Sequence, residues 1–474
     1  MKLEGFIGPT YTLEAEAAGA QRLVNLYLEG YEAGPVKNNL ARFRGTPGLR
    51  RRATLGDGPI RGIHRASTGQ LFVVSGANVY EVFSYWSAQL RSGGLASSSG
   101  RVTMASDGTR LVIGDGGATA FQVPLAAGSA VAAIGGDCPG GHVTWMDGYF
   151  IHTVPNTARI VISGLNALTY DALDTATAEG QPDNLVMPLA VGRQLFLVGE
   201  QTTEMWFNSG AADFPFQPNL AAFISTGTIA AGTAIRAHNG LVWVGNDENG
   251  QGTVWHTQGG APQRISTHAV EFALDGYERL DEASAFAYQQ GGHEFYQLSV
   301  PGGGTWVFDF TTGQWHERMY LSDTGEEPHR AWVGAVAFGE VVVGDREDGR
   351  LYTYDLEYFS DDGDEIRRFR QTGNTSQEEK RIRYNWFEIQ AEMGVGLETG
   401  QGEEPTVLLS WSDDNRHTWS NEKEKTLGQI GEYKNRARWT RLGAARNRVW
   451  RIAVSDPVPV TLLGADIGAV QLGS

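Results

Sequence analysis

Two apolar stretches, Gln70-Leu-Phe-Val-Val-Ser-Gly76 and Asn78-Val-Tyr-Glu-Val82, are separated by a single residue, Ala77. The first is a continuous apolar run, and the second alternates apolar with polar side chains. Two such runs joined at Gly and Asn predict an antiparallel β-hairpin, because these residues tolerate the backbone angles of a tight turn. The same form returns six more times, which gives seven hairpin units between about residues 61 and 354.

The spacing of these units predicts the fold. Their centres lie roughly 40 to 55 residues apart, close to the period of a four-stranded blade in a β-propeller. Flanking stretches such as Arg101–Ala105 and Ala130–Ile134 supply the outer strands of a blade, and the count favours seven blades over six. Two stacked sandwiches fit the even spacing less well. The other six hairpins pair 109–114 with 118–123, 148–152 with 159–162, 194–199 with 203–207, 241–245 with 253–256, 294–298 with 305–309, and 340–344 with 350–354.

Ring closure requires the two ends of a propeller to share a blade, because an open sheet edge invites foreign pairing. The seventh unit lacks an obvious fourth strand, whereas Leu49-Arg-Arg-Arg-Ala-Thr54 precedes the first unit. We expect this N-terminal strand to close the last blade. Its arginines point to alternate faces of a strand, which favours a solvated outer strand over a nucleic-acid patch.

Composition and charge exclude several classes of protein. The 474 residues carry a formal net charge of −17, so the whole-protein field does not favour nucleic acid or anionic membranes. The single cysteine, Cys138, excludes a disulfide framework and is expected to be a small buried hydrophobe. Neither a signal peptide nor an 18-residue apolar run is present, so we expect no secretion by that route and no membrane insertion.

Four segments are expected: an N-terminal segment (1–48), the β-propeller (49–358), a linker (359–380) and a C-terminal all-β, sandwich-like domain (381–474). The linker begins with the acidic, turn-rich run Ser360–Glu365, which lacks the ligand spacing of a calcium loop. Within the propeller, residues 170–184 and 211–231 interrupt the repeat without a strand pattern. Such inserts are where contacts with partners concentrate, although their aromatic residues could instead pack locally.

The sharpest local motif is Ser412-Asp-Asp-Asn-Arg-His-Thr-Trp419. It resembles the Asp-box of sialidases, Ser-x-Asp-x-Gly-x-Thr-Trp, with Ser412, Asp414, Thr418 and Trp419 at the matching positions. In that motif the carboxylate accepts backbone N–H bonds in a hairpin loop and the indole packs beneath it, so its role is structural. Arg416 occupies the glycine position and therefore needs an uncommon backbone angle.

No catalytic residue, cofactor or metal site is predicted. Histidine and cysteine motifs for metal, a nucleophile elbow and a phosphate loop are all missing from the sequence. A carbohydrate-binding or glycan-hydrolysing propeller of sialidase type stays open as the alternative, because acidic residues are plentiful. It would need a carboxylate pair or a tyrosine nucleophile, and none stands in a recognisable context.

The order of several short landmarks resembles the tail hub proteins of short-tailed bacteriophages (podoviruses), also called packaged-DNA stabilisation proteins. The resemblance spans nearly the whole chain. The landmarks are Val24-Asn-Leu-Tyr27, Gly45-Thr-Pro-Gly-Leu49, Gly100-Arg-Val-Thr-Met-Ala105, Gln181-Pro-Asp183, Thr202-Thr-Glu204, Ser412 to Trp419, Trp439-Thr-Arg-Leu-Gly443, and Asp456-Pro-Val-Pro-Val460 followed by Gly464.

This resemblance implies a non-enzymatic virion protein of the tail, assembled in the host cytoplasm. In that family six copies form a ring below the portal adaptor protein. The ring, or nozzle, continues the DNA channel, retains packaged DNA until genome ejection, and attaches tailspikes or fibres and a needle or plug. Double-stranded DNA passes through without sequence-specific binding. The family offers no catalytic residue to carry over.

Overall fold

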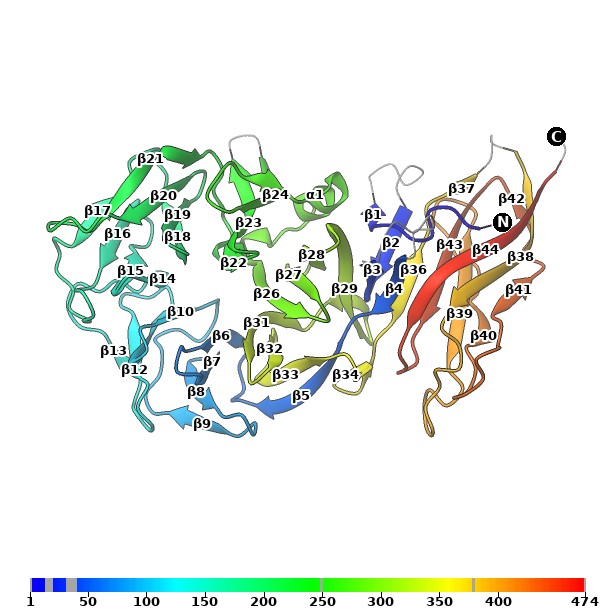
Figure 1. Cartoon of the computed structure of the whole chain (residues 1–474), viewed down its shortest axis with the longest axis horizontal. Coiled ribbons are helices and arrows are strands. Elements are labelled where there is room, and N and C mark those ends of the chain that lie inside the picture. The colour runs from blue at the N-terminus through cyan, green and yellow to red at the C-terminus, as the bar shows by residue number, and fades with distance from the viewer. Residues whose placement is uncertain (1, 13–19, 31–40, 248–249, 377–379, 473–474) are drawn as a thin grey trace.

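The computed structural model describes residues 2–12, 20–30, 41–247, 250–376 and 380–472. Figure 1 shows a ring of small sheets beside a two-layered β-structure, and both chain termini lie on the latter. The chain is therefore an all-β protein, a propeller followed by a sandwich, as predicted.

The propeller has seven blades, each built around one predicted hairpin. The innermost strand of each blade faces the centre of the ring (Figure 1), and the next two strands are the hairpin. The first blade contains β6 (Ile60–Arg65), β7 (Leu71–Ser75), β8 (Asn78–Val82) and β9 (Ala88–Arg91). The second contains β10 (Thr103–Ser106), β11 (Arg110–Gly114), β12 (Phe121–Pro124) and β13 (Ala132–Ala133). The third contains β14 (Val143–Met146), β15 (Tyr149–Thr153), β16 (Arg159–Ile162) and β17 (Thr175–Thr177), and the fourth contains β18 (Leu185–Val191), β19 (Gln194–Gly199), β20 (Thr203–Asn208) and β21 (Phe216–Ile224).

The remaining three blades follow the same order. The turn of the fifth predicted hairpin, at residues 248 and 249, lies outside the described residues. These blades are β22 (Ile235–Ala237), β23 (Gly240–Asp247), β24 (Gly250–Thr257) and β25 (Gln263–Arg264); β26 (Ser284–Gln290), β27 (His293–Ser299), β28 (Thr305–Asp309) and β29 (Gln314–Ser322) with β30 (Gly325–Pro328) at its end; and β31 (Ala331–Ala337), β32 (Glu340–Asp345), β33 (Arg350–Asp355) and β5 (Gly48–Thr54).

The N-terminal strand closes the ring, as predicted. Strand β5 pairs antiparallel with β33, with Arg50 opposite Thr353 and Gly48 opposite Asp355. Arg50 and Arg52 pair with acidic side chains of this blade, Asp355 and Glu340. The arginine run is thus part of an outer strand.

Apolar side chains from neighbouring blades fill the spaces between the sheets. Phe72 and Val74 of the first blade, for example, pack with Leu111 and Ile113 of the second. Burial of this kind contributes roughly 25 cal/mol per Å² of apolar area, which makes blade stacking the main source of rigidity. Cys138 is buried in one of these clusters, as expected.

Helix is scarce. The helix α1 (His268–Asp275) lies between the fifth and sixth blades, where Thr267 caps its first turn by accepting a hydrogen bond from the Val270 N–H. Two 3₁₀ turns, η1 (Ala231–Thr233) and η2 (Leu280–Glu282), precede the fifth and sixth blades.

The sandwich has two sheets, and both contain strands from the two ends of the chain. One sheet has the order β3 (Leu26–Gly30), β4 (Ala41–Gly45), β44 (Thr461–Gln471), β38 (Ile382–Ala391) and β41 (Arg438–Thr440), with β42 (Ala444–Ala445) beside β38. The other has β2 (Ala20–Val24), β36 (Arg368–Gln371), β43 (Asn447–Val454), β39 (Thr406–Ser412) and β40 (Lys423–Thr426), with β1 (Tyr11–Thr12) on β2 and β37 (Thr375–Ser376) on β43. Between them lies a core that includes Phe43, Phe387 and Trp450.

Strand pairing joins residues from segments that we expected to be separate. The segment boundaries themselves stay a prediction. Strands β2 and β4, which lie in the expected N-terminal segment, pair with β36 and β44. The expected linker contains β36 and also β34 (Ser360–Asp361) and β35 (Asp364–Glu365), which extend the seventh blade. Local sequence patterns do not reveal such pairing, because the partner strands lie hundreds of residues away.

The two propeller inserts also contain strands that we did not predict. Strand β17 in the first insert and β21 in the second are the outermost strands of the third and fourth blades. The short β17 and the proline at position 218 of β21 are typical of edge strands, which need only one paired side.

Candidate functional site: the seam between propeller and sandwich

The landmark Val24–Tyr27 is the point where the chain crosses from one sheet of the sandwich to the other. Asn25 is buried there with a φ of 53°, a left-handed conformation that asparagine tolerates better than most residues. Its Nδ2 donates to the carbonyl oxygens of Met319 (3.1 Å) and Arg367 (3.0 Å), and its Oδ1 accepts from Met319 N (3.0 Å). Because Met319 belongs to β29, this one side chain ties the sandwich to the sixth blade.

A buried group of charged side chains lies at the same seam. Asp361 of β34 accepts a hydrogen bond from Leu49 N at 3.2 Å. Burial raises the pKa of Asp361 to about 6, although the guanidinium groups of Arg318 and Arg368 oppose the shift. His329 Nε2 lies 3.8 Å from the Asp361 carboxylate, and burial holds the His329 pKa well below its usual value. The seam therefore contains a carboxyl group, that of Asp361, whose pKa is raised toward neutral pH.

Arg370 of β36 fastens residues 5–9 to the sandwich. It is fully buried and donates to backbone carbonyl oxygens of Phe6 (2.8 Å), Pro9 (3.0 Å) and Gly5 (3.0 Å), and to Gln21 Oε1 (3.0 Å). Burial lowers its pKa to about 9. Neutral acceptors thus hold a cation in the core, an arrangement that suits the five fixed donors of a guanidinium.

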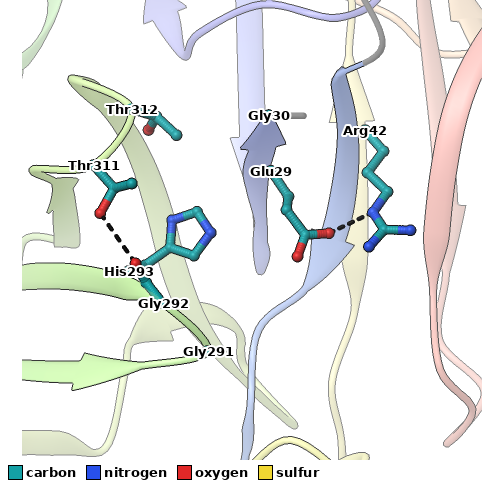
Figure 2. Close-up of a pocket in the computed structure, with 8 residues that line it drawn as sticks. All are labelled: Glu29, Gly30, Arg42, Gly291, Gly292, His293, Thr311 and Thr312. Atoms are coloured by element: carbon teal, nitrogen blue, oxygen red, sulfur yellow. Dashed lines mark hydrogen bonds and ion pairs between the residues drawn. The ribbon is translucent and has the colours of Figure 1, made fainter. Parts of the chain in front are cut away.

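A polar cavity of about 480 Å³ opens at the seam (Figure 2). Glu29 and Arg42 of the β3–β4 hairpin form one wall, where Arg42 donates to Glu29, and the opposite wall comes from the β26–β27 turn and the loop after β28. Its lining residues are Glu29, Gly30, Arg42, Gly291, Gly292, His293, Thr311 and Thr312.

His293 is the titratable group of the propeller wall of this cavity. Its Nδ1 lies 2.8 Å from Asp309 Oδ2, and this hydrogen bond raises the His293 pKa. A catalytic triad would need a hydroxyl on the other ring nitrogen. The Thr312 hydroxyl instead donates to Asp309 (2.7 Å), and Thr311 Oγ1 lies 3.5 Å from the Gly292 carbonyl oxygen. The hydrogen bonds of the two hydroxyls therefore shape the turns at this wall of the cavity.

The Asp-box-like motif, residues 412–419, forms a hydrogen-bonded loop. Asp414 Oδ1 accepts from Thr418 N (2.9 Å) and from the Ser412 hydroxyl (2.7 Å), and these bonds with Thr418 and Ser412 lower the Asp414 pKa to about 2. Arg416 has a φ of 82° at the glycine position. Trp419 packs against the guanidinium of Arg451, 3.8 Å from its ring centre. The structure thus brings the four predicted residues together in the sandwich, away from the seam cavity.

Two landmarks in the propeller meet each other. Asp183, the last residue of Gln181–Asp183, accepts from the backbone N–H groups of Gln201 and Thr202 (both 2.9 Å). Glu204 accepts from Gly180 N at 2.7 Å. The first insert is therefore fastened to the β19–β20 hairpin.

Sequence reasoning did not find the seam. Asn25 lies in the landmark Val24–Tyr27 and Asp361 lies in the acidic run Ser360–Glu365, but neither residue type indicates that its side chain is buried. The signal for Asn25 was its place between two apolar strands, where asparagine marks a sharp change of direction.

The described residues contain no group of three or more His, Cys, Asp or Glu side chains placed to hold a metal ion. None of the helices in the described part of the chain is long and apolar enough to cross a membrane.

Comparison with known proteins gives two consecutive family matches. Residues 21–358 match the family described as Bacteriophage P22 Gp10, beta-propeller, and residues 367–470 match Bacteriophage P22 Gp10, beta-sandwich. No curated protein sequence matches the chain significantly.

Among solved structures, the WD40 β-propeller domain of Doa1 is similar at 13% identity and a TM-score of 0.40, covering 65% of this chain and 96% of that one. A chain of the Mitotic Checkpoint Complex is similar at 12% identity and a TM-score of 0.44, covering 69% of this chain and 98% of that one. Likeness at this level adds nothing to the functional assignment.

Together the two family matches cover most of the sequence and divide it into the propeller and sandwich that the structure shows. The chain therefore belongs to the bacteriophage P22 Gp10 family, the tail hub or DNA-stabilisation proteins of podoviruses, and is a structural protein of a phage tail.

Proposed function

We propose that six copies of this chain form a ring below the portal adaptor protein, assembled in the host cytoplasm. The ring continues the DNA channel, retains the packaged genome, and attaches tailspikes or fibres and a needle or plug. The observation that carries this proposal is the family match over residues 21–358 and 367–470.

The seam supports a role as a rigid building block. Asn25 connects the sandwich to the sixth blade through buried hydrogen bonds to Met319, and β2 of the sandwich pairs in parallel with β29 of that blade, so the two domains are joined by direct contacts rather than by a flexible linker. A ring that resists the pressure of packaged DNA needs subunits that do not bend at such a joint.

The propeller's own axis is not the DNA path in this proposal. Arg101, which precedes β10 in the second blade, donates to Ser284 at the start of β26 in the sixth blade. The same side chain lies close to Gly232, which precedes the fifth blade, because a Cβ atom added to this glycine would be 3.0 Å from the Arg101 side chain. One side chain thus bridges the ring of blades, so the channel forms between copies.

The net negative charge of the chain is compatible with a channel through which DNA passes. With a net charge of −17, the chain repels the DNA phosphates, so a channel wall that is negative or neutral does not hold a moving duplex. A calculated surface of the assembled ring with a continuous basic lumen would contradict this part of the proposal.

Assembly contacts are assigned to the sandwich and to the propeller inserts. Sedimentation velocity of the purified chain, alone and with the portal adaptor protein, tests the ring. We expect a single species of six copies that co-sediments with the adaptor. A chain that stays monomeric with the adaptor present would overturn the proposal, and hydrolysis of host polysaccharide would favour the glycan-hydrolysing alternative.

A further inference from the structure

A second cavity, of about 420 Å³, lies on the rim of the fourth blade, between the two inserts. Its lining residues come from β17, β20, β21 and the residues beside them, and Figure 1 shows these strands on the side of the propeller away from the sandwich. The first insert contributes Thr177, Glu179 and Gly180, and β21 contributes Pro218, Asn219, Leu220, Ala222 and Phe223. Neither insert belongs to the seam.

The base of this cavity is a buried carboxylate. Glu204 is 8% exposed, and its two oxygens accept from Gly180 N and Trp206 Nε1, each at 2.7 Å. Both donors are neutral, and Glu204 makes no ion pair with any residue that the structure describes. Burying a carboxylate without a cation costs free energy, because its charge is removed from water. A cation that enters the cavity therefore gains a strong electrostatic partner.

The walls are apolar and reach the surface. Trp206, Met205 and Phe223 line the cavity, and Leu220 at its rim is 93% exposed. The pairing of β21 with β20 shifts register between Glu204 and Trp206, so several residues of β21 oppose only Met205 there. This bulge opens the cavity, and it interrupts the regular edge that another strand would need for pairing.

We propose that this cavity binds an arginine side chain from another tail protein, flanked in that partner by apolar residues. The inference rests on the proposal that the chain attaches other tail components. A planar guanidinium can use the remaining lone pairs of Glu204 in a two-point contact, while its aliphatic stem and its face pack on Trp206 and Phe223. Leu220 supplies apolar contact around the rim, as is common beside an arginine anchor.

A second copy of this chain fits the cavity less well. A two-fold contact would place Glu179 and Glu204 against their counterparts on a second copy, and the net charge of −17 makes any second copy an acidic partner, although the heterologous contacts of a six-copy ring would not bring two such cavities together. The charge of the cavity therefore favours a basic segment of a different protein.

The test uses the full-length chain and two blocked peptides, acetyl-Gly-Leu-Arg-Leu-Gly-amide and the same peptide with neutral citrulline in place of arginine. Ligand-observed NMR at millimolar peptide concentration measures binding. We expect the arginine peptide to bind at least about tenfold more tightly than the citrulline peptide, because only the guanidinium carries the charge.

Three variants locate the site. Glu204→Gln should bring the two peptides to equal affinity, and Leu220→Ser should weaken both by a similar factor. Ile430→Ser, which changes an exposed residue of the sandwich, should leave both affinities unchanged. Unchanged thermal midpoints establish that each variant is folded.

Equal binding of the two peptides to the native chain, absence of binding, or discrimination that survives Glu204→Gln would each overturn the inference. Ring formation is measured separately. The Glu204→Gln chain should assemble like the native chain, and loss of its ring would assign the cavity to a contact between copies and overturn the inference. A native chain that forms no ring refutes the proposed function whatever the peptides do.

Discussion

Replacing Asn25 tests the seam most sharply. The Asn25→Ala change removes three buried hydrogen bonds, to Met319 N, Met319 O and Arg367 O. Each contributes about 1 kcal/mol net. It also places alanine at a φ of 53°, which costs a residue with a Cβ about 1 kcal/mol more. We therefore expect a loss of about 4 kcal/mol in the free energy of unfolding.

Two further variants separate these contributions. Asn25→Gly keeps the left-handed backbone but loses the hydrogen bonds, so about 3 kcal/mol should be lost. Asn156 has a similar φ of 58° but is exposed in a turn. Asn156→Ala should therefore cost only about 1 kcal/mol.

Urea-induced unfolding followed by tryptophan fluorescence measures these differences, and limited proteolysis at 359–367 reports whether the seam opens first. The Asn25→Ala chain should expose this segment to protease at urea concentrations where the Asn156→Ala chain resists. Equal stability of the two alanine variants would refute the assignment of Asn25 as the tie between sandwich and propeller.

Acid should destabilise the protein, because burial lowers the pKa values of His152 and His316 to about 3, so the folded state binds fewer protons than the unfolded state. Their contribution to stability is complete above pH 6.5 and is lost as the pH falls toward 3. Between pH 7 and pH 5.5 these two rings should contribute about 2 to 3 kcal/mol to the difference measured by urea titration. His64, His142 and His329, whose pKa values are also lowered by burial, add in the same direction, and a flat profile would contradict the burial of these rings. Asp361 acts in the opposite direction, because its raised pKa adds stability as the pH falls through 6, so Asp361→Asn should make the loss on the acid side steeper. Arg370→Met should cost at least about 3 kcal/mol and release residues 5–9, visible as faster hydrogen exchange there, whereas unchanged exchange would argue against their anchoring. Asp414→Ala should make the 412–419 loop sensitive to protease without changing the urea midpoint of the propeller, and a protected loop would show that other contacts hold it.

Much of the propeller could be predicted because its information is local. Each blade repeats a pair of strands joined by a short turn, so alternation and turn residues identify both strands within about a dozen positions. The closing strand β5 could also be predicted, because a ring with one incomplete blade needs a strand from the other end of the chain.

The sandwich and its seam are non-local. Val24 and Leu26 belong to different sheets although they are two residues apart, and β4 pairs with β44 more than four hundred residues later. No periodicity indicates such a partner. Asp361 and Arg370 looked like solvated charges, because burial of a charged side chain depends on acceptors and countercharges from distant segments.

The predicted Asp-box-like residues were found together, because Ser412 to Thr418 interact within one short loop. Glu204 lies in the landmark Thr202–Glu204, but the sequence indicated no role for its side chain. Its position in the lining of a cavity follows from the register shift between β20 and β21, and β21 was not predicted because its apolar residues lack the alternation of a strand.

A cryo-electron microscopy reconstruction of the phage tail tests the central claim most directly. The account predicts six copies around the tail axis, each with its propeller and sandwich in the arrangement of Figure 1, and a DNA channel between copies rather than through a propeller. Copies placed away from the axis, or a propeller and sandwich that adopt several relative orientations, would contradict it.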